Sequence, residues 1–94
     1  MYIEGFVTPV PVANKQAFTD QAFRAAEVFR KYGALRSVES WGEDVPAGKT
    51  TDFLMAVKAQ PDEIVVFSWV EWPSKELRDS AYRRMEEEGA TMAD

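Results

Sequence analysis

A near-continuous apolar run, Ile64-Val65-Val66-Phe67-Ser68-Trp69-Val70-Glu71-Trp72, constrains this chain more than any other feature. It is rich in β-branched and aromatic residues and bounded by Pro61-Asp62 and Pro73-Ser74, so it predicts a β-strand. The run is too short to span a membrane as a helix, and its apolar residues fall on both strand faces, which predicts burial on both. Helices packed on one face of a single sheet leave the other open, so we expect a second copy to cover it in a twofold homodimer.

The rest of the chain divides into two amphipathic helices and shorter strand-forming segments. Phe18, Ala22, Ala25, Phe29 and Tyr32 recur at spacings of three and four, which predicts a helix between an Asn14 N-cap and Gly33. The other predicted elements are strands at Tyr2–Val10 and Ala34–Trp41, a loop at 42–52, a short strand at Phe53–Val57, and a helix from an N-cap at Ser74 through Glu88, ending at Gly89.

This order of elements, β-α-β-(β)-β-α, predicts an α+β fold. It is typical of a ferredoxin-like split βαβ arrangement, in which both helices cover one face of an antiparallel sheet. The length supports one domain over residues 1–94.

The composition excludes several kinds of chemistry. The chain contains no His and no Cys, which removes disulfides, thiolates and Ser–His–Asp catalysis. The acidic loop residues Glu43, Asp44 and Asp52 lack the spacing of a calcium loop, so we interpret them as solvated charge and expect no metal site. Because the formal net charge is −5, nucleic acid and anionic membranes are disfavoured as partners. We expect a cytoplasmic protein without a cofactor.

Three segments resemble a known family. They are Tyr2-Ile3-Glu4-Gly5-Phe6-Val7-x-Pro9-Val10-Pro11, then Glu39-x-x-x-x-Asp44-Val45-Pro46-x-Gly48-Lys49-x-Thr51-x-Phe53, and then Val65-Val66-Phe67-Ser68-Trp69-x-x-x-Pro73-Ser74. Together they resemble the YbaA-like family, domain of unknown function 1428. The resemblance implies membership of the dimeric α/β-barrel superfamily, a homodimer whose sheets close into one barrel, and no established activity. In the family pattern a final strand follows the second helix, and this sequence does not contain it. Either the sequence omits a tail or the protein has only part of the sheet, in which case we expect an exposed sheet edge.

The candidate site centres on Glu39, a carboxyl group in a predicted strand among aromatic residues. In a covered cavity its pKa would rise and it could serve as a catalytic acid or base; at a sheet edge it would simply face solvent. Alternation puts Glu39 and Trp41 on one strand face. The candidate ligand-binding residues are Trp41, Asp44, Lys49, Thr51 and Trp69.

Two classes of function stay open at this stage. The first is a protein that binds a small apolar or aromatic molecule in a barrel pocket, either as an enzyme or only as a receptor. The second is a non-catalytic regulatory or protein-interaction dimer without a small-molecule pocket. In the second case the loop residues only order the loop: Asp44 accepts backbone N–H groups and Lys49 pairs with Glu39.

Overall fold

The apolar run forms the central strand of the sheet. In the computed structural model, which describes residues 1–90, this strand is β3 (Glu63–Trp72). It pairs antiparallel with β1 (Tyr2–Pro11) and with β2 (Arg36–Trp41), in the order β1-β3-β2. The α+β class and the antiparallel sheet are therefore confirmed, and the arrangement is consistent with a ferredoxin-like fold. The chain end at Met92-Ala93-Asp94 lies outside the described residues.

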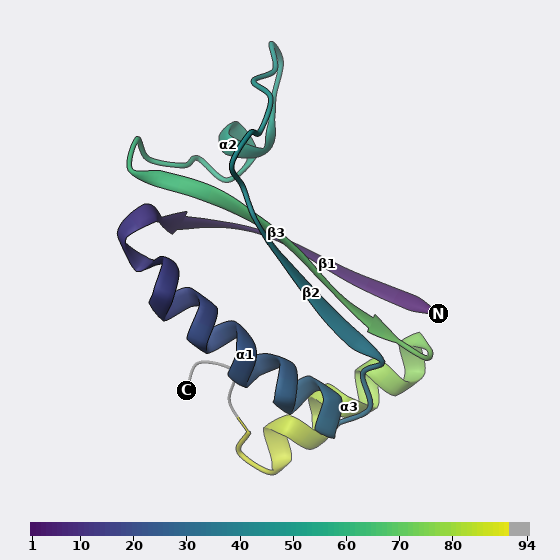
Figure 1. Ribbon diagram of the computed structural model, residues 1–94. Helices are drawn as coiled ribbons and strands as arrows, with labels where there is room; N and C mark the ends of the chain where they lie inside the picture. The colour runs from purple at the N-terminus through teal and green to yellow at the C-terminus, as the bar shows by residue number, and fades with distance from the viewer. Residues whose placement is uncertain (91–94) are drawn as a thin grey trace.

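The two long helices lie on one side of the sheet, as Figure 1 shows. A 3₁₀ turn, η1 (Val12–Asn14), leads from β1 into α1 (Lys15–Lys31). The second long helix, α3 (Lys75–Glu87), begins at Ser74, whose hydroxyl accepts the Leu77 N–H at 3.1 Å. Within the described residues, no helix is long and apolar enough to cross a membrane.

Register decides which side chains face the helices. Ser68 of β3 lies opposite Phe6 of β1 and opposite Glu39 of β2. Since facing residues of antiparallel strands share a sheet face, all three point to the helix side. We call the other side the open face; it carries Phe67 and Trp69, the neighbours of Ser68 in the chain.

The best-packed core lies where α1 and α3 meet the end of β3. Trp72 is 0% exposed there, with the Phe29 ring edge-on at 5.9 Å and the Tyr82 ring at 6.2 Å. Val70 of β3 and Met85 of α3 belong to the same buried cluster. This core therefore joins α1, α3 and β3 at one end of the sheet. The middle of α1 lies over β2 and does not pack against α3 there.

Two local predictions need correction. The segment Phe53–Val57 was expected to form a strand but contains the short helix α2 (Phe53–Ala56). The physical reason is its N-cap, because the Asp52 carboxylate accepts the Met55 N–H at 2.7 Å. The second strand begins at Arg36 rather than at Ala34, because Ala34 is still bonded to α1 through the Phe29 carbonyl.

The helix ends were predicted with mixed success. Ser74 caps α3 as expected, and Gly33 and Gly89 have the positive φ values of 112° and 69° that favour glycine after a helix. Asn14 does occupy the N-cap position of α1, but its side chain makes no capping hydrogen bond. The turn η1 fills that role instead, since the Lys15 N–H donates to the Val12 carbonyl.

Candidate functional site

Strand β2 presents its predicted site residues to the helix side of the sheet. Glu39 lies opposite Ser68, and Trp41 lies opposite Val66, in the β2–β3 register. Ser68 and Val66 are both buried under the helices. Glu39 and Trp41 therefore share a face, as alternation predicted, and that face is the one α1 covers.

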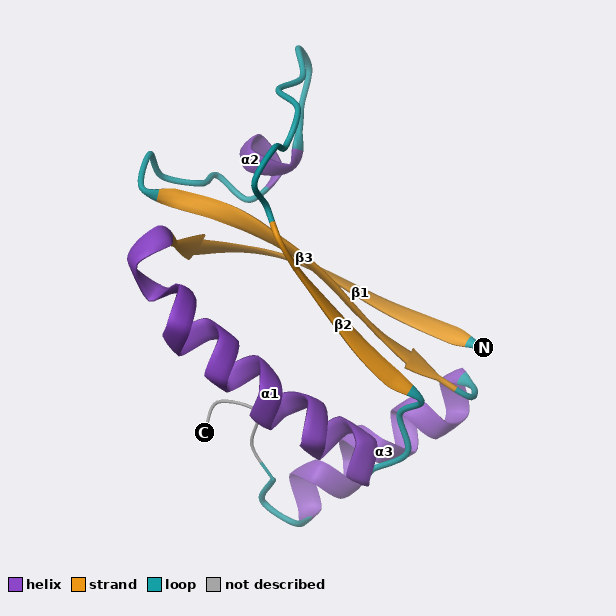
Figure 2. Ribbon diagram, viewed as in Figure 1, coloured by secondary structure: helices purple, strands orange, loops and turns teal. Residues whose placement is uncertain are grey.

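A groove of about 350 Å³ separates α1 from β2. Its helix wall comes from residues at i, i+4 and i+8 of α1, namely Phe18, Ala22 and Ala26. The two alanines are too short to reach the sheet, so the space above β2 stays unfilled. The sheet wall is formed by Trp41 and Val66. Figure 2 shows α1 running along the sheet with β2 on the side that faces it.

Glu39 is the acidic group of this groove. Burial raises the pKa of its carboxyl group, while a hydrogen bond with the Ser68 side chain acts in the opposite direction. The carboxyl group still reaches solvent, because Glu39 as a whole is exposed. It also lines an adjoining hollow of about 380 Å³ that extends towards Thr8 and Val10 of β1. Glu39 thus lies between two hollows and is reachable by a ligand from either one.

Trp41 forms the aromatic end of the groove. The Phe18 ring lies 6.4 Å from the Trp41 ring, tilted by 56°. Lys15, the first residue of α1, places its Nζ atom 5.3 Å from the centre of the same Trp41 ring. Within one groove the chain therefore combines three aromatic side chains (Phe18, Phe23 and Trp41), one ammonium group and one carboxyl group, all on helix α1 and strand β2.

The remaining candidate residues lie elsewhere. Trp69 is on the open face, where its Nε1 donates to the Glu71 carboxylate at 2.9 Å. Asp44, Lys49 and Thr51 are exposed on the loop that follows β2. The structure therefore brings together Glu39 and Trp41 but not the other four. Among residues 1–90 no ion pair joins Lys49 to Glu39, so the proposed loop-ordering pair does not form.

Asp52, rather than Asp44, orders this loop. Its carboxylate accepts the Gly48 N–H at 2.9 Å as well as the Met55 N–H at 2.7 Å. These two backbone hydrogen bonds lower the pKa of the Asp52 carboxyl group. Phe53, the next residue, stacks on Phe67 with the ring centres 5.7 Å apart, which holds α2 against the open face. The loop is thereby anchored across the sheet from the groove.

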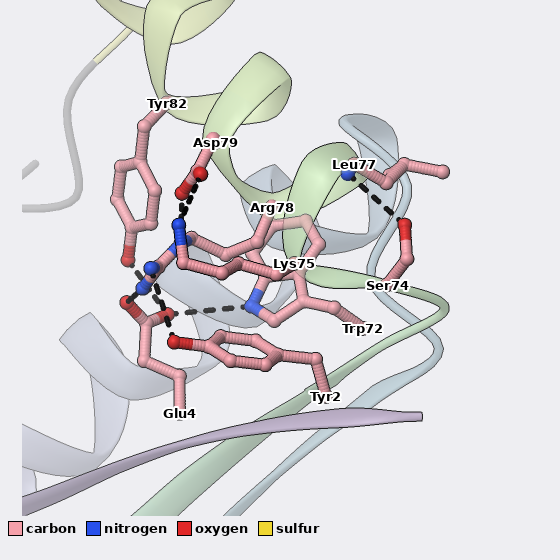
Figure 3. A network of polar contacts seen from close by, with 9 residues as sticks. All are labelled: Tyr2, Glu4, Trp72, Ser74, Lys75, Leu77, Arg78, Asp79 and Tyr82. Carbon is pink, nitrogen blue, oxygen red and sulfur yellow. Dashed lines mark hydrogen bonds and ion pairs between the residues drawn. The ribbon is translucent and has the colours of Figure 1, made fainter.

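A cluster of polar side chains outside the groove, drawn in Figure 3, joins β1 to α3. Its members form hydrogen bonds with one another. The Glu4 carboxylate accepts hydrogen bonds from Arg78 at 2.7 Å, Tyr82 at 2.9 Å and Trp72 Nε1 at 3.3 Å. Burial and the bond to Glu4 raise the pKa of the Tyr82 hydroxyl, which stays protonated as a donor. Arg78 also bonds the Tyr2 hydroxyl at 3.1 Å. Each of these residues has a hydrogen-bond partner inside the cluster, so we interpret the cluster as a structural clamp.

Sequence reasoning missed most of the helix wall of the groove. The stripe that contains Phe18 and Ala22 was recognised, but only as a helix face packed on the core. The small side chains at Ala22 and Ala26 were the available signal, because two alanines one helical turn apart cannot fill the space that larger residues would. Lys15 gave no signal in the sequence, since a lysine at the start of a helix is usually solvated.

Comparison with known proteins supports the sequence resemblance. The family model "Protein of unknown function (DUF1428)" matches residues 1–94. The "Uncharacterized protein YbaA" of Escherichia coli (strain K12) and that of Shigella flexneri are each 56% identical to this chain over 84 residues. The match covers 89% of this chain and 72% of each relative. The chain therefore belongs to the DUF1428 family.

Proposed function

We propose that this protein binds a small apolar or aromatic molecule in the groove between α1 and β2. The observation that carries the proposal is the position of Glu39, a carboxyl group with a raised pKa on the floor of an aromatic-walled groove. Apolar walls with a few placed polar groups are characteristic of small-molecule sites, and about 350 Å³ lies within their usual range of about 300–1,000 Å³.

The walls supply affinity and Glu39 supplies orientation. Phe18 and Trp41 present ring faces and edges that a flat ligand can pack against. The Glu39 carboxyl group can accept a hydrogen bond when ionised and donate one when protonated. Because its pKa is raised, the Glu39 carboxyl group titrates closer to neutral pH than an ordinary glutamate. Glu39 is therefore also the group that would exchange a proton with a bound ligand.

A titration with 2-naphthamide tests this proposal. We expect amide NMR signals of α1 and β2 around the groove to shift saturably in the wild-type protein. Ala22→Trp fills the groove from its helix wall and should abolish the shifts. Arg24→Trp adds the same side chain to an exposed position of α1 outside the groove, so binding should persist. Absence of saturable shifts in the wild-type protein would contradict the proposal.

We propose in addition that the protein is a homodimer that covers the open face. The support is the apolar character of that face, where Ile3 is 51% exposed and Val7 and Phe67 also reach solvent. The three residues share one face of β1 and β3, where Val7 lies opposite Phe67 and Ile3 lies opposite Glu71. A contiguous apolar patch on a sheet is the usual mark of an interface. In this arrangement the groove faces away from the interface, and each protomer keeps its own site.

Size-exclusion chromatography with light scattering tests the dimer. We expect twice the chain mass for the wild-type protein and a single chain mass for Ile3→Lys. Phe23→Lys is the matched control, because Phe23 is 69% exposed on α1 and lies outside the open face. A wild-type monomer at high protein concentration would contradict the dimer. A dimer without any ligand in the groove would favour the alternative, a non-catalytic interaction protein. The cytoplasmic location stays a prediction.

A further inference from the structure

Lys15 gives the groove a charge that the protein does not neutralise. Among residues 1–90 no carboxylate lies within ion-pairing distance of its Nζ atom. Lys75 of α3, in contrast, pairs with Asp79 at 2.7 Å. The contact that Lys15 does make is with the face of Trp41, at 5.3 Å. The chain has a net charge of −5. A lysine beside the groove wall therefore makes the electrostatic potential there positive relative to that of the protein as a whole.

The two charged groups of the groove are separated along its length. Glu39 and Trp41 are two residues apart on β2, a spacing of about 6.7 Å along an extended strand. Lys15 is held at the Trp41 end, and Glu39 lies on the sheet floor opposite Ser68. A flat molecule beside Trp41 therefore meets an ammonium group towards one end of the groove and a carboxyl group towards the other.

This arrangement discriminates among ligand charges. A cationic ligand is disfavoured on the Trp41 ring, because the Lys15 ammonium already occupies the ring face that attracts cations. An anionic group beside Lys15 gains a charge-assisted hydrogen bond that a neutral group lacks. Burial raises the pKa of the Glu39 carboxyl group, a direction that lessens its repulsion of an anion.

We propose that the groove selects aromatic acids: the ring packs beside the contacting Phe18 and Trp41 rings, and the carboxylate pairs with Lys15. This inference rests on the proposed function, because it names the ligand class of the same groove. Glu39 then contacts the far edge of the ring and favours a hydroxyl or protonated nitrogen substituent there. Lys15 is the residue that determines specificity, while the two aromatic rings contribute affinity that does not depend on charge.

Binding of 2-naphthoate and 2-naphthamide, which share one ring system and differ in charge, tests the inference. We expect the acid to bind the wild-type protein about threefold to tenfold more tightly than the amide at low ionic strength. This is the difference in affinity expected from a single, partly exposed ion pair, which salt would weaken. Lys15→Met should remove this preference, so that the acid and the amide bind the variant with similar affinity. Lys15→Arg should retain it. Lys31→Met is the matched control, because Lys31 lies over the Tyr32 ring of the same protein at 5.7 Å, outside the groove.

The outcomes separate this inference from the proposed function. If both probes bind the wild-type protein with equal affinity, or if Lys15→Met keeps the preference for the acid, the inference is overturned and the groove remains a binding site. If neither probe binds, the proposed function fails and the inference fails with it. Loss of the preference in Lys31→Met as well as in Lys15→Met would overturn the role of Lys15, because it would show a general effect of net charge.

Discussion

Removal of the Trp72 side chain should cost a large part of the stability of this domain. Trp72 is 0% exposed, packs edge-on against Phe29, and donates its indole N–H to Glu4 at 3.3 Å. Core Trp→Ala substitutions cost about 3–5 kcal/mol, and because Trp72 is fully buried we expect a loss of about 4 kcal/mol. A chain of this length has about 5–14 kcal/mol of total stability, so Trp72→Ala should leave a marginal fold.

Urea denaturation followed by circular dichroism measures this effect without relying on the removed fluorophore. Trp72→Phe keeps a ring against Phe29 but loses the bond to Glu4, so we expect an intermediate loss of about 1–3 kcal/mol. Phe23→Ala is the control, since Phe23 is 69% exposed and its removal should change stability by less than about 0.5 kcal/mol. If Trp72→Ala costs no more than Phe23→Ala, the position of the core at this end of the sheet is wrong.

Three further predictions concern the loop, the groove carboxyl group and a glycine. The pKa of Asp52 is lowered, so its contribution to stability is present above the unfolded pKa and lost as pH falls through the lower folded value. The protection factor of the Met55 amide against hydrogen exchange should fall in that window, and an unchanged protection factor would contradict the cap. The pKa of Glu39 is raised, so stability falls as pH rises from the unfolded value of 4.5 through the higher folded value. Glu39→Gln should therefore melt higher than the wild-type protein at pH 7 and equally below pH 4.5, and a lower melting temperature at pH 7 would refute the desolvation argument. Gly42→Ala should destabilise the fold, because a Cβ atom there would clash with the Val65 carbonyl oxygen of β3. Gly5→Ala is the control and should be tolerated, because the nearest atom to a Cβ there is 3.9 Å away. Equal urea midpoints for the two variants would contradict the prediction.

The order of the main elements could be predicted from the sequence because each carries a strong periodic signal. The run that forms β3 is rich in β-branched and aromatic residues, and the stripe from Phe18 to Tyr32 has helical spacing over several turns. The segment at Phe53 was predicted wrongly, since a few apolar residues do not distinguish a strand from a helical turn. Its structure was decided by the Asp52 carboxylate, which lies just outside the segment.

The candidate site was predictable only in part, because strand alternation places residues on a face but does not say which face the helices cover. Glu39 and Trp41 were grouped correctly by their spacing of two. Trp69 was grouped with them by residue type alone. It follows Ser68 in β3, and because Ser68 faces the helices, Trp69 lies on the open face. The Lys15 contact with Trp41 depends on how α1 packs over β2, which is a tertiary feature with no local signal.

The central claim is that small aromatic molecules bind between α1 and β2. The most direct measurement is of intermolecular NOEs between 2-naphthamide and the protein at saturating probe concentration. We expect NOEs from the probe protons to the Ala22 methyl group and to the Phe18 and Trp41 rings. NOEs to Ile3 and Phe67 instead would place binding on the open face and contradict the claim, as would the absence of any NOE at saturation.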